Sequence, residues 1–223
     1  MITLTDITKV YGEGAAAIHA LGGVSMTVEP GESVAIMGPS GSGKTTLLNI
    51  VGLLDAPDNG GYRLFDHEVF TRGDRELSHL RNETFGFVFQ SFNLLPRYTA
   101  VENVEVPLRY SNRPRKDRRE RAMEALRKVG LADRALHTPS ELSGGQQQRV
   151  AIARALANEP KVILADEPTG NLDSTSAQGI MDVLGTLNEN GMTLIMITHA
   201  QEIAARAKRI VQLRDGRIAD GGA

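Results

Sequence analysis

Apolar residues follow two different periods along the chain. Near the N-terminus they alternate with polar ones, from Ile2 and Leu4 through residues 18–28 around the Gly22-Gly23 pair. Such alternation, interrupted by glycine, predicts antiparallel strands. Four later segments are short and continuously apolar, which is typical of strands buried on both faces. These segments are residues 33–37, 85–89, 162–165 and 192–198.

Helical spacing of apolar residues separates these runs. We expect helices over residues 44–54, 75–81 and 177–188, and helical patterns dominate from residue 91 to residue 160. Strands that alternate with helices predict an α/β fold with a largely parallel, doubly wound sheet. We interpret residues 91–160 as a helical subdomain inserted into this core, in a chain that forms a single domain over residues 1–223.

The composition excludes several classes of protein. The chain has 223 residues, of which 41% are hydrophobic, and a formal net charge of -2. This charge gives no electrostatic reason to expect nucleic acid as a partner, and we expect none. The chain contains no cysteine, which excludes disulfides and thiolate chemistry. No apolar run approaches the roughly 18 residues of a membrane-spanning helix, and the start of the chain lacks the pattern of a signal peptide.

The strongest chemical motif lies between the first apolar run and the helix that follows it. Its residues are Gly38, Pro39, Ser40, Gly41, Ser42, Gly43, Lys44 and Thr45, followed by Thr46. A glycine, four residues and Gly-Lys-Thr have the spacing of a phosphate-binding loop. The glycines let successive N–H groups point at phosphate oxygens, Lys44 supplies a charge to the β and γ phosphates, and the Thr45 hydroxyl suits Mg²⁺. The loop predicts binding of a nucleoside triphosphate, without indicating what is done with it.

Polar residues follow the other three apolar runs. Gln90 follows the second run, Asp166 and Glu167 follow the third, and His199 follows the fourth. Because ligands of an open parallel sheet lie beyond the carboxyl ends of its strands, we expect these side chains around one triphosphate. Asp166 suits magnesium and Glu167 suits polarisation of an attacking water. Gln90 and His199 suit contacts to metal, water or γ-phosphate, although each alone has a plainer interpretation as an ordinary surface or packed residue.

A second helix start carries the residues Leu142-Ser143-Gly144-Gly145-Gln146. Ser143 and Gln146 have the spacing of a capping box, so the plain interpretation is a well-capped helix. Against it stands the Gly-Gly pair, because glycine in the first turn costs helix stability and leaves N–H groups bare for an anion. The sequence thus indicates two phosphate-binding helix ends, which can use a single γ-phosphate only if they face one another.

Together these motifs resemble those of the ATP-binding cassette (ABC) ATPases, over essentially the whole chain. The matching segments are residues 142–146 for the signature, 162–168 for the Walker B strand, 171–173 for the D-loop, Gln90 for the Q-loop, His199 for the switch histidine and Tyr11 for the aromatic that stacks on adenine. Within the family, residues 85–108 and 142–173 are most similar to the ATPases of macrolide exporters and lipoprotein-release systems. The D-loop begins Gly170-Asn171, a form shared by this subgroup, where the more widespread form begins Ser-Ala.

The resemblance implies a phosphate-loop NTPase with a RecA-like core, an N-terminal antiparallel β subdomain and the inserted helical subdomain. It implies two copies packed head to tail, with each ATP held between the phosphate loop of one copy and the signature of the other. ATP and Mg²⁺ are the implied cofactors, with Thr45, Gln90 and Asp166 at the metal and with Glu167, assisted by His199 and Gln90, in catalysis. The residues implied to serve the nucleotide across the interface are Ser143, Gly144, Gly145, Gln146 and Asp173.

The family also implies a membrane permease as partner. We expect it to dock near residues 90–98, whose apolar side chains would receive a short helix of the permease; the alternative is burial of these side chains under the helical subdomain. We expect a cytoplasmic protein, peripheral on the inner face of the cell membrane, that drives export or mechanical work. A regulatory ATPase of the division-associated type, which gates a membrane partner without transport, remains the alternative.

Overall fold

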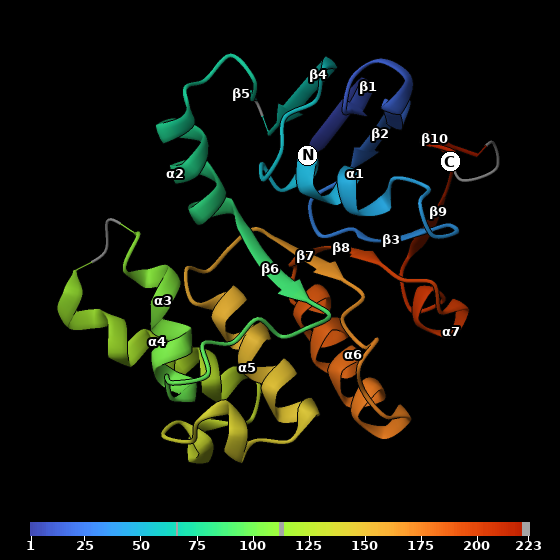
Figure 1. Cartoon of the computed structure of the whole chain (residues 1–223). Coiled ribbons are helices and arrows are strands. Elements are labelled where there is room, and N and C mark those ends of the chain that lie inside the picture. The colour runs from blue at the N-terminus through green and yellow to red at the C-terminus, as the bar shows by residue number, and fades with distance from the viewer. Residues whose placement is uncertain (66, 112–113, 220–223) are drawn as a thin grey trace.

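The computed structural model describes residues 1–65, 67–111 and 114–219, and the strands in these residues form two sheets on either side of helix α1 (Lys44–Val51) (Figure 1). The smaller sheet has the strand order β2-β1-β4-β5 and is antiparallel throughout. Its strands are β1 (Ile2–Tyr11), β2 (Ile18–Val28), β4 (Asn59–Leu64) and β5 (His67–Glu68). The antiparallel N-terminal strands expected from the alternating pattern are therefore confirmed.

The larger sheet has the order β10-β9-β3-β8-β7-β6. Its strands are β3 (Ser33–Met37), β6 (Phe85–Phe89), β7 (Val162–Asp166), β8 (Thr193–Ile197), β9 (Arg209–Arg214) and β10 (Arg217–Ile218). All four apolar runs are parallel strands of this sheet, which confirms the expected architecture. The last two strands were not expected, because residues 209–214 mix charged and apolar positions and lack the continuous apolar run of a buried strand.

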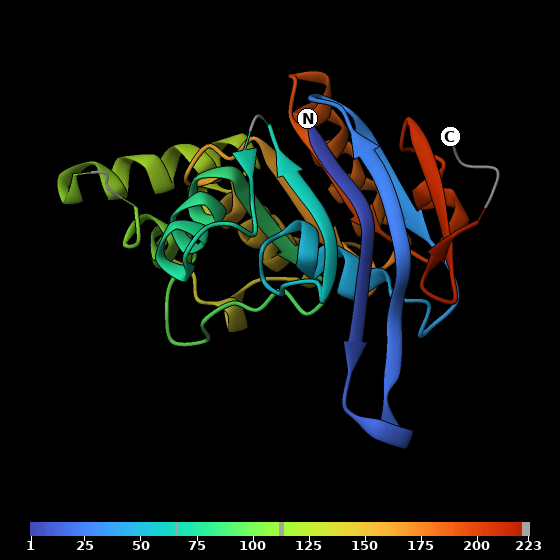
Figure 2. The same cartoon turned by 90° about the horizontal axis from the view of Figure 1, so that it is seen from above.

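Helices cover both faces of the larger sheet (Figure 1). Besides α1 they are α2 (Asp74–Thr84), α3 (Ala100–Leu108), α4 (Arg118–Lys128), α5 (Gly144–Leu156), α6 (Ser174–Glu189) and α7 (Gln201–Ala204). Helix α1 lies between the two sheets, whereas α5 and α6 pack on the opposite face of the larger sheet. Seen from above, α3 and α4 lie at the far side of the molecule from β9 and β10 (Figure 2).

Helix α1 is shorter than the expected helix over residues 44–54. The carbonyl of Val51 accepts a hydrogen bond of 2.6 Å from the hydroxyl of the buried Tyr62 in β4. At the next residue, Gly52, a Cβ atom would lie 2.6 Å from the ring of Phe87, so the chain leaves the helix where it touches the larger sheet. Tertiary contacts thus end this helix, and the periodicity of apolar residues contains no sign of them.

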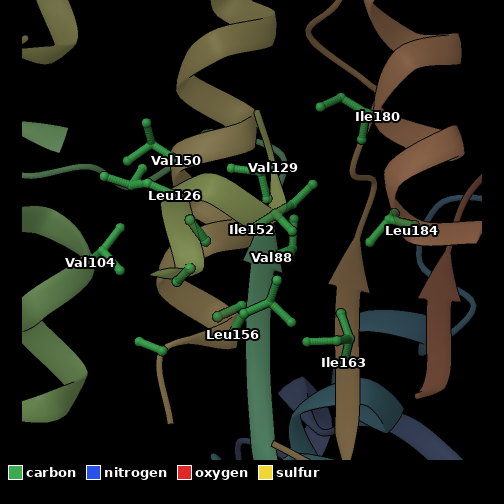
Figure 3. Close-up of a cluster of buried hydrophobic side chains, with 14 of the residues drawn as sticks. Val88, Val104, Leu126, Val129, Val150, Ile152, Leu156, Ile163, Ile180 and Leu184 are labelled. Atoms are coloured by element: carbon green, nitrogen blue, oxygen red, sulfur yellow. The ribbon is translucent and has the colours of Figure 1, made fainter. Parts of the chain in front are cut away.

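The helices in residues 91–160 share a hydrophobic core with the larger sheet. One buried cluster joins Val104 of α3, Leu126 of α4 and Ile152 of α5 to Val88 of β6 and Ile163 of β7 (Figure 3). The expected helices are present, and Gly130 follows α4 with φ 72°, as expected of a residue that ends a helix. The boundaries of a helical subdomain at residues 91 and 160 remain a prediction.

Helix α5 approaches β6 closely because residue 86 is glycine. A Cβ atom there would lie 2.5 Å from the carbonyl oxygen of Ala155 and 2.8 Å from Cδ1 of Ile163. We expect Gly86→Ala to lower the free energy of unfolding by about 1–3 kcal/mol, since the backbone of α5 must move away from the sheet. Urea unfolding followed by circular dichroism measures the change.

The matched control is Gly185→Ala in α6. Among the described residues outside its own helical turn, none has an atom within 4 Å of a Cβ built at Gly185, so this substitution should raise stability by about 0.5–1 kcal/mol. Equal stability changes for the two variants would show that the approach of α5 to β6 does not require glycine.

Candidate functional site

The phosphate loop passes between two strands that leave no room for side chains at two of its glycines, Gly38 and Gly43. A Cβ atom at Gly38 would lie 2.0 Å from the carbonyl oxygen of Leu213, in β9. At Gly43, where φ is 97°, it would lie 2.2 Å from the carbonyl oxygen of Ala20, in β2. These two glycines therefore set the curvature of the loop through close packing, in addition to exposing N–H groups to phosphate.

Lys44 begins α1 and folds back over the loop. Its ammonium donates hydrogen bonds to the carbonyl oxygens of Gly38 at 2.9 Å and Pro39 at 2.8 Å. The N-cap residue Gly43 offers no side chain to the first N–H groups of α1. A lysine and a bare helix N-terminus thus face the same concave loop, which is the arrangement expected for binding phosphate.

Two carboxylates stand at the end of β7, Asp166 as its last residue and Glu167 directly after it, and they have different environments. Burial, followed by the charge of Glu167, raises the pKa of the Asp166 carboxyl above its usual range, and the nearby Lys44 ammonium opposes this rise. Glu167 adopts the left-handed backbone conformation, with φ 49°, and its N–H donates to the carbonyl of Ile197 at 3.0 Å. Its carboxylate lies 2.7 Å from Nδ1 of His199, whose ring is largely exposed. The structure therefore brings Lys44, Asp166, Glu167 and His199 together as expected.

Gln90 lies at the same edge of the sheet, because Phe89 pairs in register with Asp166. Its side-chain amide donates to Oδ1 of Asn171 at 3.3 Å, and the Asn171 amide donates to the Gln90 carbonyl at 3.1 Å. Reasoning from the sequence placed Asn171 in the D-loop and gave it no partner. Gln90 therefore lies at the expected edge of the sheet, and its hydrogen-bond partner Asn171 was not expected.

Tyr11 lies at the end of β1 and is held beside α1. Its hydroxyl donates to Oδ2 of Asp55 at 2.6 Å and also interacts with Thr46. Lys9 forms an ion pair of 2.9 Å with Asp55, and its ammonium lies 5.2 Å from the centre of the Tyr11 ring. Burial, followed by the hydrogen bond to Asp55, raises the pKa of the Tyr11 hydroxyl. Asp55 was missed, because nothing in the local pattern connects an acid after α1 with an aromatic residue 44 positions earlier.

The signature tip, residues 143–146, forms the expected capping box at the start of α5. Ser143 donates its N–H to the Gln146 side chain at 2.9 Å, and the Gln146 N–H donates to the Ser143 hydroxyl at 3.3 Å. A Cβ atom at Gly144 would lie 3.3 Å from Leu172, and one at Gly145 would lie 3.1 Å from Ser176. The two glycines therefore also allow close packing on the start of α6, a role that sequence reasoning did not foresee.

Asp173 is the N-cap of α6. Its carboxylate accepts hydrogen bonds from the Ser176 N–H at 2.9 Å and from the Ser176 hydroxyl at 2.7 Å. The backbone hydrogen bond, followed by that of the hydroxyl, holds the pKa of this carboxyl below its usual range. The Asp173 carboxylate thus already accepts two hydrogen bonds within its own chain.

The phosphate loop and the signature tip belong to helices on opposite faces of the larger sheet (Figure 1). The two glycines of the tip lie close to Phe92, Leu172 and Ser176. The expected catalytic and phosphate-binding groups therefore gather at one edge, whereas the second phosphate-binding helix end lies apart from them.

Comparison with known proteins gives the family. Residues 21–170, about two thirds of the chain, match the family model described as ABC transporter. The chain belongs to this family. The match includes the phosphate loop, Gln90, the signature tip and both carboxylates at the end of β7.

Curated relatives cover almost all of this ABC protein. It is 52% identical over 98% of its length to the uncharacterized ABC transporter ATP-binding protein YknY of Bacillus subtilis, of which it covers 95%. It is also 52% identical over 98% of its length to the macrolide export ATP-binding/permease protein MacB of Hyphomonas neptunium, of which it covers 34%. The chain thus spans about a third of that combined ATPase and permease.

A solved structure of a related cassette agrees closely with the fold. The post-hydrolysis dimer of the ATP-binding cassette MJ0796, bound to ADP and phosphate, matches with a TM-score of 0.90 and 46% identity, covering 100% of this chain and 98% of the other. The present chain is therefore an ATP-binding, ATP-hydrolysing ABC cassette. Within the residues that the structure describes, no helix combines the length and apolar character needed to span a membrane.

Asp166→Asn tests the electrostatic cost of the site in the absence of ligand. Because the pKa of Asp166 is raised in the folded chain, its ionisation with rising pH lowers the free energy of unfolding. The amide should therefore raise the thermal midpoint of the nucleotide-free protein near pH 7, by about 2–4 °C for each 1 kcal/mol relieved. The gain should shrink as the pH falls and vanish below the ordinary pKa of an aspartate, about 3.9, where the wild-type carboxyl is protonated in both states.

Asp133→Asn is the control for this measurement. Asp133 is mostly exposed and pairs only with its neighbour Arg134 among the described residues, so its replacement should leave the midpoint nearly unchanged. A midpoint that falls in Asp166→Asn would mean that attraction by Lys44 outweighs burial.

Proposed function

We propose that this chain binds MgATP in the phosphate loop and hydrolyses it with Glu167 as the group that polarises the attacking water. The observation that carries the proposal is the Glu167–His199 pair, 2.7 Å apart, at the strand edge that also holds Lys44. A carboxylate that already accepts from an imidazole can orient a water beside it and receive its proton. The exposure of His199 leaves this pair accessible to the γ-phosphate and to water.

Lys44 would bind the triphosphate by exchanging partners. Its two hydrogen bonds to uncharged loop carbonyls would give way to contacts with the β and γ phosphates, in which donor and acceptor carry opposite charges. The loop around it is already curved by packing at Gly38 and Gly43. Binding would therefore require little reorganisation of the backbone.

The residues at this edge fit a magnesium ion. Thr45, Gln90 and Asp166 offer a hydroxyl, an amide oxygen and a carboxylate, all of them oxygen ligands that Mg²⁺ accepts. Burial, followed by the charge of Glu167, raises the pKa of the Asp166 carboxyl, and a bound cation would oppose this rise. When bound, the metal would neutralise charge that develops on the β and γ phosphates.

A second copy of the chain would complete each site. The signature tip lies on the face of the sheet opposite α1, so a γ-phosphate in the loop is out of line with the tip of the same chain. In a head-to-tail pair, Ser143, Gly144 and Gly145 of one copy would approach the phosphate in the other. The dimeric structure of MJ0796 supports this arrangement. ATP would then hold the pair together, and hydrolysis would weaken it.

Glu167→Gln tests this mechanism. The amide keeps the shape of the side chain but cannot take a proton, so we expect ATP binding to persist and turnover to fall by about 100-fold or more. The variant should form a stable dimer in the presence of ATP, measured by size-exclusion chromatography with light scattering. Rapid hydrolysis by this variant would exclude the assigned role.

Lys44→Ala is the companion variant. Removing the ammonium should abolish most nucleotide affinity and the ATP-dependent dimer together, as measured with a fluorescent ATP analogue. Undiminished nucleotide binding by Lys44→Ala would argue against the loop as the site.

A membrane permease would dock on a cleft beside the segment after Gln90. The cleft has a volume of about 660 Å³. It is lined by Asn93 from that segment, by Phe87 of β6, by Pro107 of α3 and the exposed Tyr110 after that helix, and by Arg154 of α5. The apolar residues expected to receive the permease differ in exposure. Leu94 packs against the core, whereas Leu95 remains 42% exposed. The macrolide-export relatives, which join an ATPase to a permease, support a peripheral position on the inner face of the cell membrane and a role in export or mechanical work.

Photo-crosslinking tests the docking site. A photoreactive amino acid at Leu95 or Tyr110 should crosslink to the permease encoded beside this chain when the two are expressed together in cells. The matched control is Leu136, which is 70% exposed and does not line the cleft. Crosslinks to the permease from Leu136 but from neither Leu95 nor Tyr110 would place the docking surface elsewhere.

A further inference from the structure

The two amides of Gln90 and Asn171 lock each other's orientation. A backbone carbonyl can only accept hydrogen bonds, so the contact of 3.1 Å to the Gln90 carbonyl places the NH₂ group of Asn171 on that side. The oxygen of Asn171 must then face the Gln90 side chain, where it can only accept. Gln90 therefore presents its NH₂ group to Asn171, at 3.3 Å, and its oxygen points away.

Close packing keeps this pair in place. A Cβ atom at Gly170 would lie 2.6 Å from the Gln90 amide nitrogen and 3.0 Å from its amide carbon. A larger residue at this position would have to push the Gln90 side chain aside. The turn is closed by the Gly170 N–H, which donates to the Glu167 carbonyl at 3.0 Å. The chain that supports Gln90 is thus tied directly to the residue after Asp166.

We infer that Asn171 is a positioning residue that directs the oxygen of the Gln90 amide toward the metal. A free glutamine amide can turn over and present NH₂, which repels a cation. Asn171 removes that alternative, because turning the Gln90 amide over would place its oxygen against Oδ1 of Asn171, two acceptors facing each other, and lose the hydrogen bond. The inference rests on the proposed role of Gln90 at Mg²⁺.

The test measures metal binding without turnover. Mn²⁺ replaces Mg²⁺, AMP-PNP replaces ATP, and electron paramagnetic resonance reports free Mn²⁺ during titration of the full chain. We expect Asn171→Ala to weaken Mn²⁺ binding about fivefold and Gln90→Ala to weaken it at least as much. The double variant should match Gln90→Ala alone, because Asn171 acts only through Gln90.

A matched control is Asn190→Ala, which also removes an exposed asparagine bonded to a backbone carbonyl, at the end of α6, and should leave Mn²⁺ binding unchanged. The outcomes separate the two claims. Unchanged binding in Asn171→Ala, beside weakened binding in Gln90→Ala, would overturn the positioning role alone. Additive losses in the double variant would also overturn it. Unchanged binding in Gln90→Ala would overturn the metal role of Gln90 and the inference with it.

Discussion

The parallel register of β6, β7, β8 and β3 is the constraint on which the site depends. Phe89 pairs with Asp166, Asp166 pairs with Ile197, and Ile36 pairs with Ile197 from the other side. Because these strands end at the same level, the residues that follow them meet at one edge of the sheet. A slip of one residue in any pair would turn a catalytic side chain to the other face. The buried apolar cores on both faces hold the register.

Much of this arrangement could be predicted from the sequence. The continuous apolar runs are the strands buried on both faces, and the polar residues that follow them are the groups that converge on the phosphate loop. This success has a physical reason, since both the strands and the loop are specified by local patterns. Ser143 and Gln146 likewise form the capping box that their spacing predicts.

The features that sequence reasoning missed depend on contacts between distant segments. Asp55 holds Tyr11, Asn171 holds Gln90, and Arg154 of α5 donates to the carbonyl oxygens of Phe92 and Asn93. Burial lowers the pKa of Arg154, and its two hydrogen bonds to that segment help to offset the loss of hydration. None of these pairs has a characteristic spacing. Strand β9 was missed for a related reason, because its partner β3 rather than its own composition makes it a strand.

Helix α1 is fastened at both ends to the smaller sheet. Gly43, before its first residue, packs against the carbonyl of Ala20 in β2, and its last carbonyl accepts from Tyr62 in β4. The helix that carries Lys44 therefore cannot tilt against that sheet without breaking a contact at one end. The smaller sheet therefore helps to place Lys44, whereas Asp166 and Glu167 are placed by the larger sheet.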